Sequence, residues 1–168
     1  MRYNALIFVT FLSVTAGSAR ADWGVRVDGP DVFGDTTVVA VSEGQKGNFV
    51  IQCNQTDQLD VAYTIKKKEF DTVEARPADL LVQVDGGRPT KLPAILDNWN
   101  DNYIGIAVKD RSPDLVALIR AIGNAKHAIN IGILVGSIRE SDTFEAVGST
   151  HAMTQVIQGC KLDNINEE

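Results

Sequence analysis

The residues best suited to chemistry in this chain are two histidines and a serine close to one of them. His127 precedes an expected strand, and His151 lies in the first turn of an expected helix, two residues after Ser149. Neither histidine has a second histidine or a carboxylate three or four residues further on, which a metal-binding helix face requires. Ser149 is explained more simply as a helix cap or a first-turn residue, and no G-x-S-x-G elbow surrounds it. We therefore predict no catalytic residue and no metal site.

Acidic and aromatic side chains gather in one expected connection between strands. Asp97, Trp99, Asp101 and Tyr103 lie within seven positions of one another, with Asp110 shortly after them. Carboxylates beside an exposed tryptophan can form a platform for a carbohydrate or a peptide, while the same residues also occur in ordinary polar loops. The run at residues 97–101 lacks the glycine and the distal glutamate of an EF-hand, so a calcium loop is excluded. The four residues are kept as a candidate binding loop.

Three other motifs have plain explanations. Lys66, Lys67 and Lys68 follow an expected strand and suit a solvated turn or a charged strand edge, with a basic contact patch as the alternative. Residues 54–56 (Asn-Gln-Thr) match the N-glycosylation pattern, which is accidental in a bacterial protein. The paired glycines Gly86 and Gly87 lie at a turn and not between a strand and a helix, where a phosphate loop would be. No cofactor is implied.

The first 21 residues have the pattern of an export signal. Arg2 is followed by an apolar stretch of about twelve residues, which is shorter than the roughly twenty that span a bilayer. Ala19 and Ala21 form a small-x-small site, so cleavage is predicted after Ala21, leaving one domain over residues 22–168. We expect a periplasmic or secreted protein without a transmembrane segment. The remaining chain has 14 basic and 22 acidic residues, a net charge of −8, which argues against nucleic acid and anionic lipid as partners.

The chain has two cysteines, Cys53 and Cys160. In an oxidising compartment an even pair predicts one disulfide, which would close a loop of about a hundred residues and stabilise the fold by about 4–5 kcal/mol. Two free thiols or a metal pair are the alternatives. The metal pair is disfavoured because no histidine neighbours the cysteines and the spacing is unlike C-x-x-C.

Alternating apolar residues predict short strands through the first two thirds of the chain. The expected strands cover residues 23–27, 37–42, 48–53, 59–65, 80–84, 91–96 and 104–108. Residues 85–88 (Asp-Gly-Gly-Arg) predict a hairpin turn, and Pro93 suggests that residues 91–96 form an edge strand. Such alternation indicates an antiparallel sheet with one buried face.

The last third predicts a helix, a strand and a second helix. Ser112, Pro113 and Asp114 form a helix start, and Gly123 supplies the stop. Residues 128–135 return as a central strand, and a second helix runs from Gly148 to Gly159, just before Cys160. The predicted class is α+β: an antiparallel, β-sandwich-like sheet with two helices in the C-terminal third and one disulfide.

Several segments together resemble a known group of exported bacterial proteins. They are residues 35–39 (DTTVV), 49–53 (FVIQC) and 82–89 (VQVDGGRP) with Trp99 behind them, and the run from Phe144 through Gly148 and Ala152 to Cys160. This layout resembles the type VI secretion accessory family. The invasion-associated locus B family is similar over the Val-Asp turn and the last helix, but it typically has more cysteines. The resemblance implies a β-rich, disulfide-closed protein that acts by binding, and it lends no catalytic residues.

The first functional hypothesis is a non-enzymatic periplasmic accessory or binding protein, with an envelope or secretion-machinery protein as its partner. The alternative is a periplasmic inhibitor of a basic hydrolase such as lysozyme, since charge complementarity would speed that association. A third reading is an enzyme whose carboxylates, such as Asp97 and Asp101, are assembled in space.

Overall fold

The computed structural model describes residues 22–53, 58–68 and 72–163. The predicted signal peptide and the Asn-Gln-Thr motif at residues 54–56 lie outside this part. In chain order the elements are β1 (Trp23–Asp28), β2 (Thr37–Glu43), β3 (Asn48–Cys53), β4 (Leu59–Lys66), β5 (Arg76–Val84), β6 (Thr90–Asn98), β7 (Tyr103–Lys109), α1 (Pro113–Gly123), β8 (Ala128–Val135), β9 (Ile138–Glu145) and α2 (Ser149–Gly159). None of the described helices is long and apolar enough to cross a membrane.

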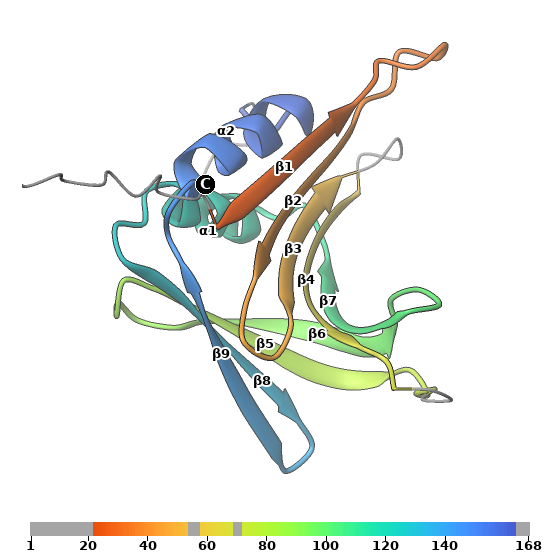
Figure 1. Ribbon diagram of the computed structural model, residues 1–168, viewed down its shortest axis with the longest axis vertical. Coiled ribbons are helices and arrows are strands. Elements are labelled where there is room, and N and C mark those ends of the chain that lie inside the picture. Colours follow the sequence, from red (N-terminus) through yellow and green to blue (C-terminus); the bar gives the residue numbers. More distant parts are fainter. Residues whose placement is uncertain (1–21, 54–57, 69–71, 164–168) are drawn as a thin grey trace, which may run out of the picture.

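The nine strands of the described residues belong to one antiparallel sheet in the order β1-β2-β3-β4-β7-β6-β5-β8-β9. The sheet curls into a half-barrel, so that the β1–β4 half faces the β5–β9 half (Figure 1). The predicted α+β class, the antiparallel sheet and the two C-terminal helices are confirmed. The curl explains the sandwich-like pattern, because a single bent sheet brings two of its own layers face to face.

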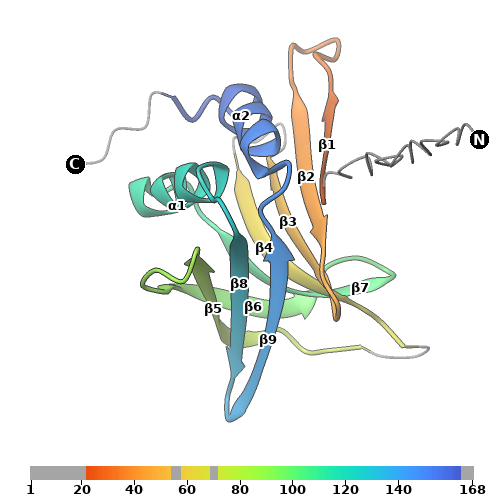
Figure 2. The same cartoon turned by 60° about the vertical axis from the view of Figure 1, so that its left-hand side comes forward.

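The core lies on the inner face of the curl and beneath the helices. Phe49 is fully buried and contacts both Trp23 and Phe144 with ring centroids 5.8 Å apart. Helix α2 packs on α1 and on β1, β2 and β3, and both helices lie at one end of the sheet (Figure 2). Every second residue of β2 and β8 is buried, as the alternation predicts.

The disulfide joins Cys53, the last residue of β3, to Cys160, the first residue after α2. The two Cα atoms are 5.8 Å apart, and the bridge spans 107 residues. Cys160 is 4% exposed, so the bond is buried between helix and sheet. The predicted pairing is confirmed, and it ties α2 to the sheet. A structural disulfide is consistent with an extracytoplasmic protein.

Two predictions about strands were wrong. The strand containing Pro93 is not an edge strand, because β6 lies between β5 and β7. Its pairing with β7 begins only at Ile95, so Pro93 lies where no ladder is formed on the β7 side. Strand β9 was not predicted at all, because it is an edge strand whose only buried residues are Asp142 and Phe144.

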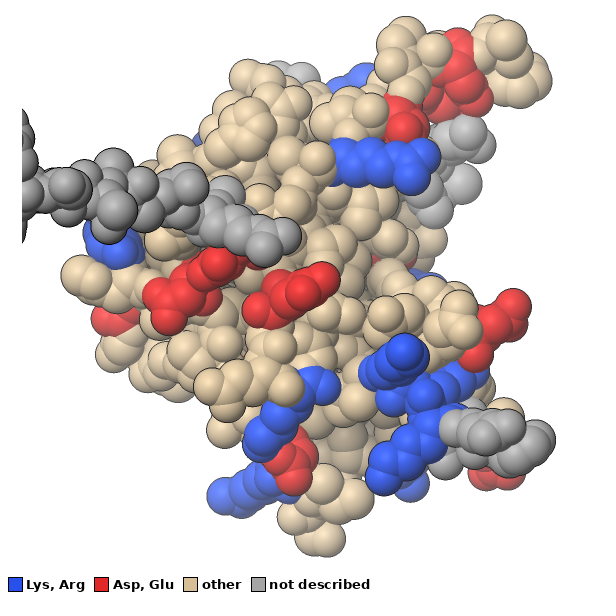
Figure 3. All heavy atoms as spheres, in the orientation of Figure 1, with Lys and Arg blue, Asp and Glu red and all other residues tan. Residues whose placement is uncertain are grey.

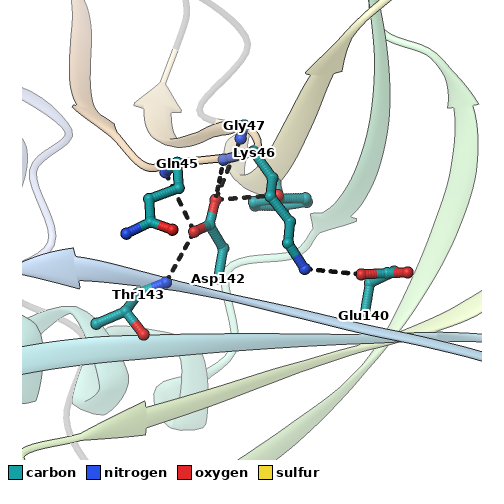
Figure 4. A network of polar contacts seen from close by, with 7 residues as sticks. Gln45, Lys46, Gly47, Glu140, Asp142 and Thr143 are labelled. Atoms are coloured by element: carbon teal, nitrogen blue, oxygen red, sulfur yellow. Dashed lines mark hydrogen bonds and ion pairs between the residues drawn. The ribbon is translucent and has the colours of Figure 1, made fainter.

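A buried carboxylate closes the curl between β9 and the turn that joins β2 to β3 (Figure 4). One oxygen of Asp142, Oδ2, accepts hydrogen bonds from the amides of Lys46 at 2.9 Å and Gly47 at 3.1 Å, and from the hydroxyl of Tyr63 at 3.2 Å. The other oxygen, Oδ1, accepts from the amides of Gln45 and Thr143. We call this group, Asp142 with its five donors, the Asp142 latch.

The latch needs its tight turn and a charged carboxylate. A Cβ atom at Gly44 would lie 2.5 Å from Asp142 Oδ2, and one at Gly47 would lie 2.5 Å from the carbonyl oxygen of Thr64. Burial raises the pKa of Asp142, but the hydrogen bonds, led by that from Lys46, outweigh burial and leave the pKa below its usual value. Burial and the charge of Asp142 raise the pKa of Tyr63, which therefore stays a donor.

Candidate functional site

The candidate site is a groove that opens where β6 and β7 separate. The two strands pair only between Ile95–Asn98 and Ile104–Ala107, and beyond this point they diverge over the start of α1. The space has a volume of about 840 Å³. Its lining includes Gln52, Asp60, Ile95, Asp97, Trp99 and Asp110. We call it the Trp99 groove.

Small residues of β7 make the floor of the Trp99 groove. Gly105 and Ala107 follow each other on the face of the sheet that lines it, and both are buried. Trp99 lies against Gly105, since a Cβ atom built there would be 3.1 Å from Cε3 of the indole ring. Glycine at this position therefore leaves room for the ring to lie close to the strand. Half-buried Trp99 and the 49% exposed Ile95 give the groove an apolar wall.

A buried carboxylate lies in the same groove. Asp60 of β4 is paired with Gln52 on one side and with Lys109 on the other, and it is only 6% exposed. Its Oδ2 accepts a hydrogen bond from the side chain of Gln52 at 3.1 Å. Its Oδ1 is buried and has no hydrogen-bond partner among the described residues. A buried acceptor without a partner is costly and points to a donor that comes from outside the chain.

The connection between β7 and α1 contributes another carboxylate, that of Asp110. Asp110 accepts hydrogen bonds from the hydroxyl and amide of Ser112 and from the amide of Arg111. The hydroxyl bond is the largest influence, and the pKa of Asp110 lies below its usual value. Ser112 is the N-cap residue as predicted, but its hydroxyl does not bond to the helix. Asp110 therefore stays charged at the edge of the groove.

The charge of the groove is negative. Among the described residues its lining holds four carboxylates, from Asp60, Asp97, Asp110 and Asp114, and two ammonium groups, from Lys91 and Lys109. Lys91 is 3.0 Å from Asp79, which lies outside the groove, so part of its charge is already neutralised. An acidic hollow with an indole wall suits a cationic ligand, because the ring face and the carboxylates both attract positive charge.

The structure separates the four residues of the predicted binding loop. Asp97 and Trp99 line the groove, and Asp101 and Tyr103 do not belong to its lining. Asp101 is exposed in the β6–β7 turn, and the carbonyl oxygen of Tyr103 accepts the amides of Trp99 and Asn100. Sequence reasoning missed Asp60 and Gln52. The available signal was an aspartate inside the apolar run of β4, at a position that the period of two alone places on the solvated face of the sheet.

His127 lies beside a hydrogen-bonded turn and does not line the groove. His127 is exposed, and its amide donates to Asp85, as do the amides of Lys126 and Ala128. These bonds, led by that from Lys126, keep the pKa of Asp85 below its usual value at the predicted hairpin turn.

Ser149 is not the cap of α2, because Gly148 is the N-cap and Ser149 is the first helical residue. Its hydroxyl is buried without a hydrogen-bond partner in the described part of the chain, whereas His151 is exposed, so the two are not paired. Lys67 donates to the carbonyl oxygen of Asn100 at 2.8 Å and so supports the β6–β7 turn. Within the described ranges no three His, Cys, Asp or Glu residues are grouped to hold a metal ion.

No protein-family model, curated protein or solved structure matches the chain.

Proposed function

We propose that this is a non-enzymatic, exported binding protein of the bacterial cell envelope, and that the Trp99 groove holds a basic side chain of a protein partner. The observation that carries the proposal is Asp60, whose buried Oδ1 has no hydrogen-bond partner among the described residues and which lines an acidic groove. An envelope or secretion-machinery protein is the expected partner.

The chemistry of the groove favours lysine or arginine as the group it receives. A buried carboxylate is stabilised when a cationic donor approaches it, because the donor supplies both a hydrogen bond and an opposite charge. The indole of Trp99 would cover the aliphatic stem or attract the cationic end. Tryptophan and buried charge pairs are the groups that contribute most at protein interfaces. A basic side chain would use both features at once.

A binding role is also favoured over catalysis by the way the carboxylates are engaged. Asp110 is held by Ser112 and Arg111, and Asp97 accepts the amide of Asn98 at 2.7 Å. The lowered pKa of Asp110 keeps this carboxylate charged near neutral pH, which suits it to attracting a cation and not to exchanging protons. The disulfide supports the exported location, and the pattern of residues 1–21 predicts a signal peptide for export.

The proposal is tested by crosslinking in the native cell envelope, followed by affinity purification through a C-terminal tag and mass spectrometry. Wild type is compared with Asp60→Asn and Trp99→Ala, and Ile138→Ser, an exposed position on β9 outside the groove, is the matched control. We expect one defined envelope protein with wild type and the control, and at least about a tenfold lower recovery with the groove variants. Equal recovery with all four proteins, or no enriched protein at all, would contradict the proposal.

Two observations favour a second candidate, an inhibitor of a basic hydrolase. The groove holds twice as many carboxylates as ammonium groups, and the chain has a net charge of −6. Such a surface would attract a strongly basic enzyme. The same purification separates the two readings, because the inhibitor reading predicts a hydrolase in the eluate and slower lysis of cell walls when the purified protein is added.

A further inference from the structure

The connection between β1 and β2, residues 29–36, projects from the body of the molecule, and we call it the tip loop (Figures 1 and 2). Its two central side chains point into solvent: Val32 is 93% exposed and Phe33 is 84% exposed. Val27, on the arm of the same hairpin, is 46% exposed. These side chains form an apolar end that nothing in the described part of the chain covers.

The tip loop is ordered by hydrogen bonds within the loop, two of which are accepted by the side chain of Asp31. Oδ1 of Asp31 accepts the amides of Phe33 at 2.8 Å and Asp35 at 3.0 Å. The amide of Asp31 donates to the carbonyl oxygen of Asp35, and that of Gly34 donates to the carbonyl oxygen of Asp31. Gly34 has a φ of +86°, which glycine adopts without strain. A loop of this kind presents its side chains in one fixed arrangement, so a partner would not have to order it on binding.

The loop geometry does not require apolar residues at positions 32 and 33. The four hydrogen bonds named above are donated by backbone amides, so serine or asparagine could take the place of valine or phenylalanine without losing one of them. An exposed phenylalanine at the end of an ordered hairpin gives no stability to the isolated fold, whereas its burial in a partner is favourable. The two side chains are therefore suited to filling a pocket outside this chain.

The charges around the tip loop define the partner. Asp28, Asp31 and Asp35 flank the apolar end, and the stretch from residue 27 to residue 45 contains no lysine or arginine. Arg26, at the base, is paired with Asp28 at 2.6 Å. Figure 3 shows acidic and uncharged atoms at this end and basic atoms only nearer the body. Carboxylates beside the apolar residues are repelled by an anionic bilayer surface and attracted by a basic rim.

We propose that the tip loop is a docking element that inserts Val32 and Phe33 into an apolar pocket of a protein partner, with lysine or arginine residues around that pocket. The proposal does not depend on the Trp99 groove, which is lined by residues of β3, β4, β6, β7 and the start of α1. A second copy of this acidic chain is disfavoured by like charge, and a membrane is disfavoured by the three carboxylates.

The test places the photo-crosslinking amino acid benzoylphenylalanine at position 33, and at position 138 as the control, in cells that make the protein. We expect one protein adduct from position 33 that is absent from position 138. The crosslinked protein is then purified, and its binding to wild type, Phe33→Ser, Asp35→Asn and Ile138→Ser is measured by calorimetry. Phe33→Ser should weaken binding by about tenfold or more. Asp35→Asn should reduce the salt dependence of binding, and Ile138→Ser should bind like wild type.

Melting curves distinguish a loss of binding from a loss of the folded structure. Phe33 is mostly exposed, so Phe33→Ser should unfold at the wild-type temperature, and any loss of binding then belongs to the tip loop. The absence of an adduct specific to position 33, an adduct with lipid, or an adduct between two copies of this chain would overturn the proposal. Unchanged affinity of Phe33→Ser for the crosslinked protein would overturn it as well.

Discussion

Replacing Cys53 and Cys160 together by serine should lower the melting temperature of the protein by about 10 °C or more. The bridge closes a loop of 107 residues, and closing a loop of this length reduces the entropy of the unfolded chain by the equivalent of about 4–5 kcal/mol. Losses measured on removing native disulfides are about 2–5 kcal/mol, because strain and residual structure reduce the entropic gain. Helix α2 would then keep its place through packing alone.

Thermal unfolding followed by circular dichroism, with and without dithiothreitol, measures this effect. The reductant should bring wild type to the melting temperature of the double-serine variant and should leave that variant unchanged. A double-serine variant that melts within about 2 °C of wild type would show that the bridge contributes little stability.

Replacing Asp142 by alanine should destabilise the protein by about 3–5 kcal/mol. The substitution removes a buried acceptor and leaves the amides of Gln45, Lys46 and Gly47 without a partner at the turn between β2 and β3. It also leaves the Tyr63 hydroxyl without its acceptor. Because the latch joins the edge strand β9 to the opposite half of the sheet, we expect β9 to lose protection from hydrogen exchange first.

The matched control for the latch is Glu140→Ala on the same strand. Glu140 pairs with Lys46 at 2.9 Å, but both side chains are more than half exposed, so its loss should cost about 1 kcal/mol or less. Urea unfolding of the two variants gives the comparison. If Asp142→Ala were no less stable than Glu140→Ala, the latch would not hold the curl.

The low pKa of Asp142 gives the latch a pH dependence with a definite sign. Its folded pKa lies below the ordinary value of 3.8, so the charged form stabilises the native state. This stabilisation is complete above the ordinary value and is lost as the pH falls through the folded one. The difference in free energy of unfolding between wild type and Asp142→Asn should therefore be constant near neutral pH and shrink in acid below pH about 4.

The alternation of apolar and polar residues predicted most of the sheet, because burial of one face of a strand imposes a period of two residues. Strand β8, with Ile129, Ile131, Ile133 and Val135 buried, shows this directly. Strand β9 could not be found in this way, because its two buried residues are a phenylalanine, Phe144, and a carboxylate, Asp142. The carboxylate is stable on the inner face only because the β2–β3 turn donates hydrogen bonds to it. The position of β6 depends on strand order, which Pro93 alone does not determine.

The groove was predictable in part. The residue types of Asp97 and Trp99 predicted a binding loop, and both residues line the groove. Asp101 and Tyr103 do not line the groove, because the β6–β7 turn separates them from it. The geometry of this turn depends on the hydrogen bonds that the side chain of Asn100 accepts from the amides of Asn102 and Tyr103. Asp60 enters through the pairing of β4 with β7, which brings together residues about fifty positions apart. Pairing between distant strands is not encoded in any local pattern.

The central claim, that the Trp99 groove receives a basic side chain, is tested most directly by a two-dimensional ¹H–¹⁵N NMR titration. The probe is a capped pentapeptide containing two lysines, and the control peptide has glutamines in their place. We predict that the lysine peptide shifts the indole signal of Trp99 and the amides of Asp60, Gly105 and Ala107, and that Asp60→Asn abolishes these shifts. Equal shifts with both peptides, or shifts that persist in Asp60→Asn, would contradict the assignment of the groove.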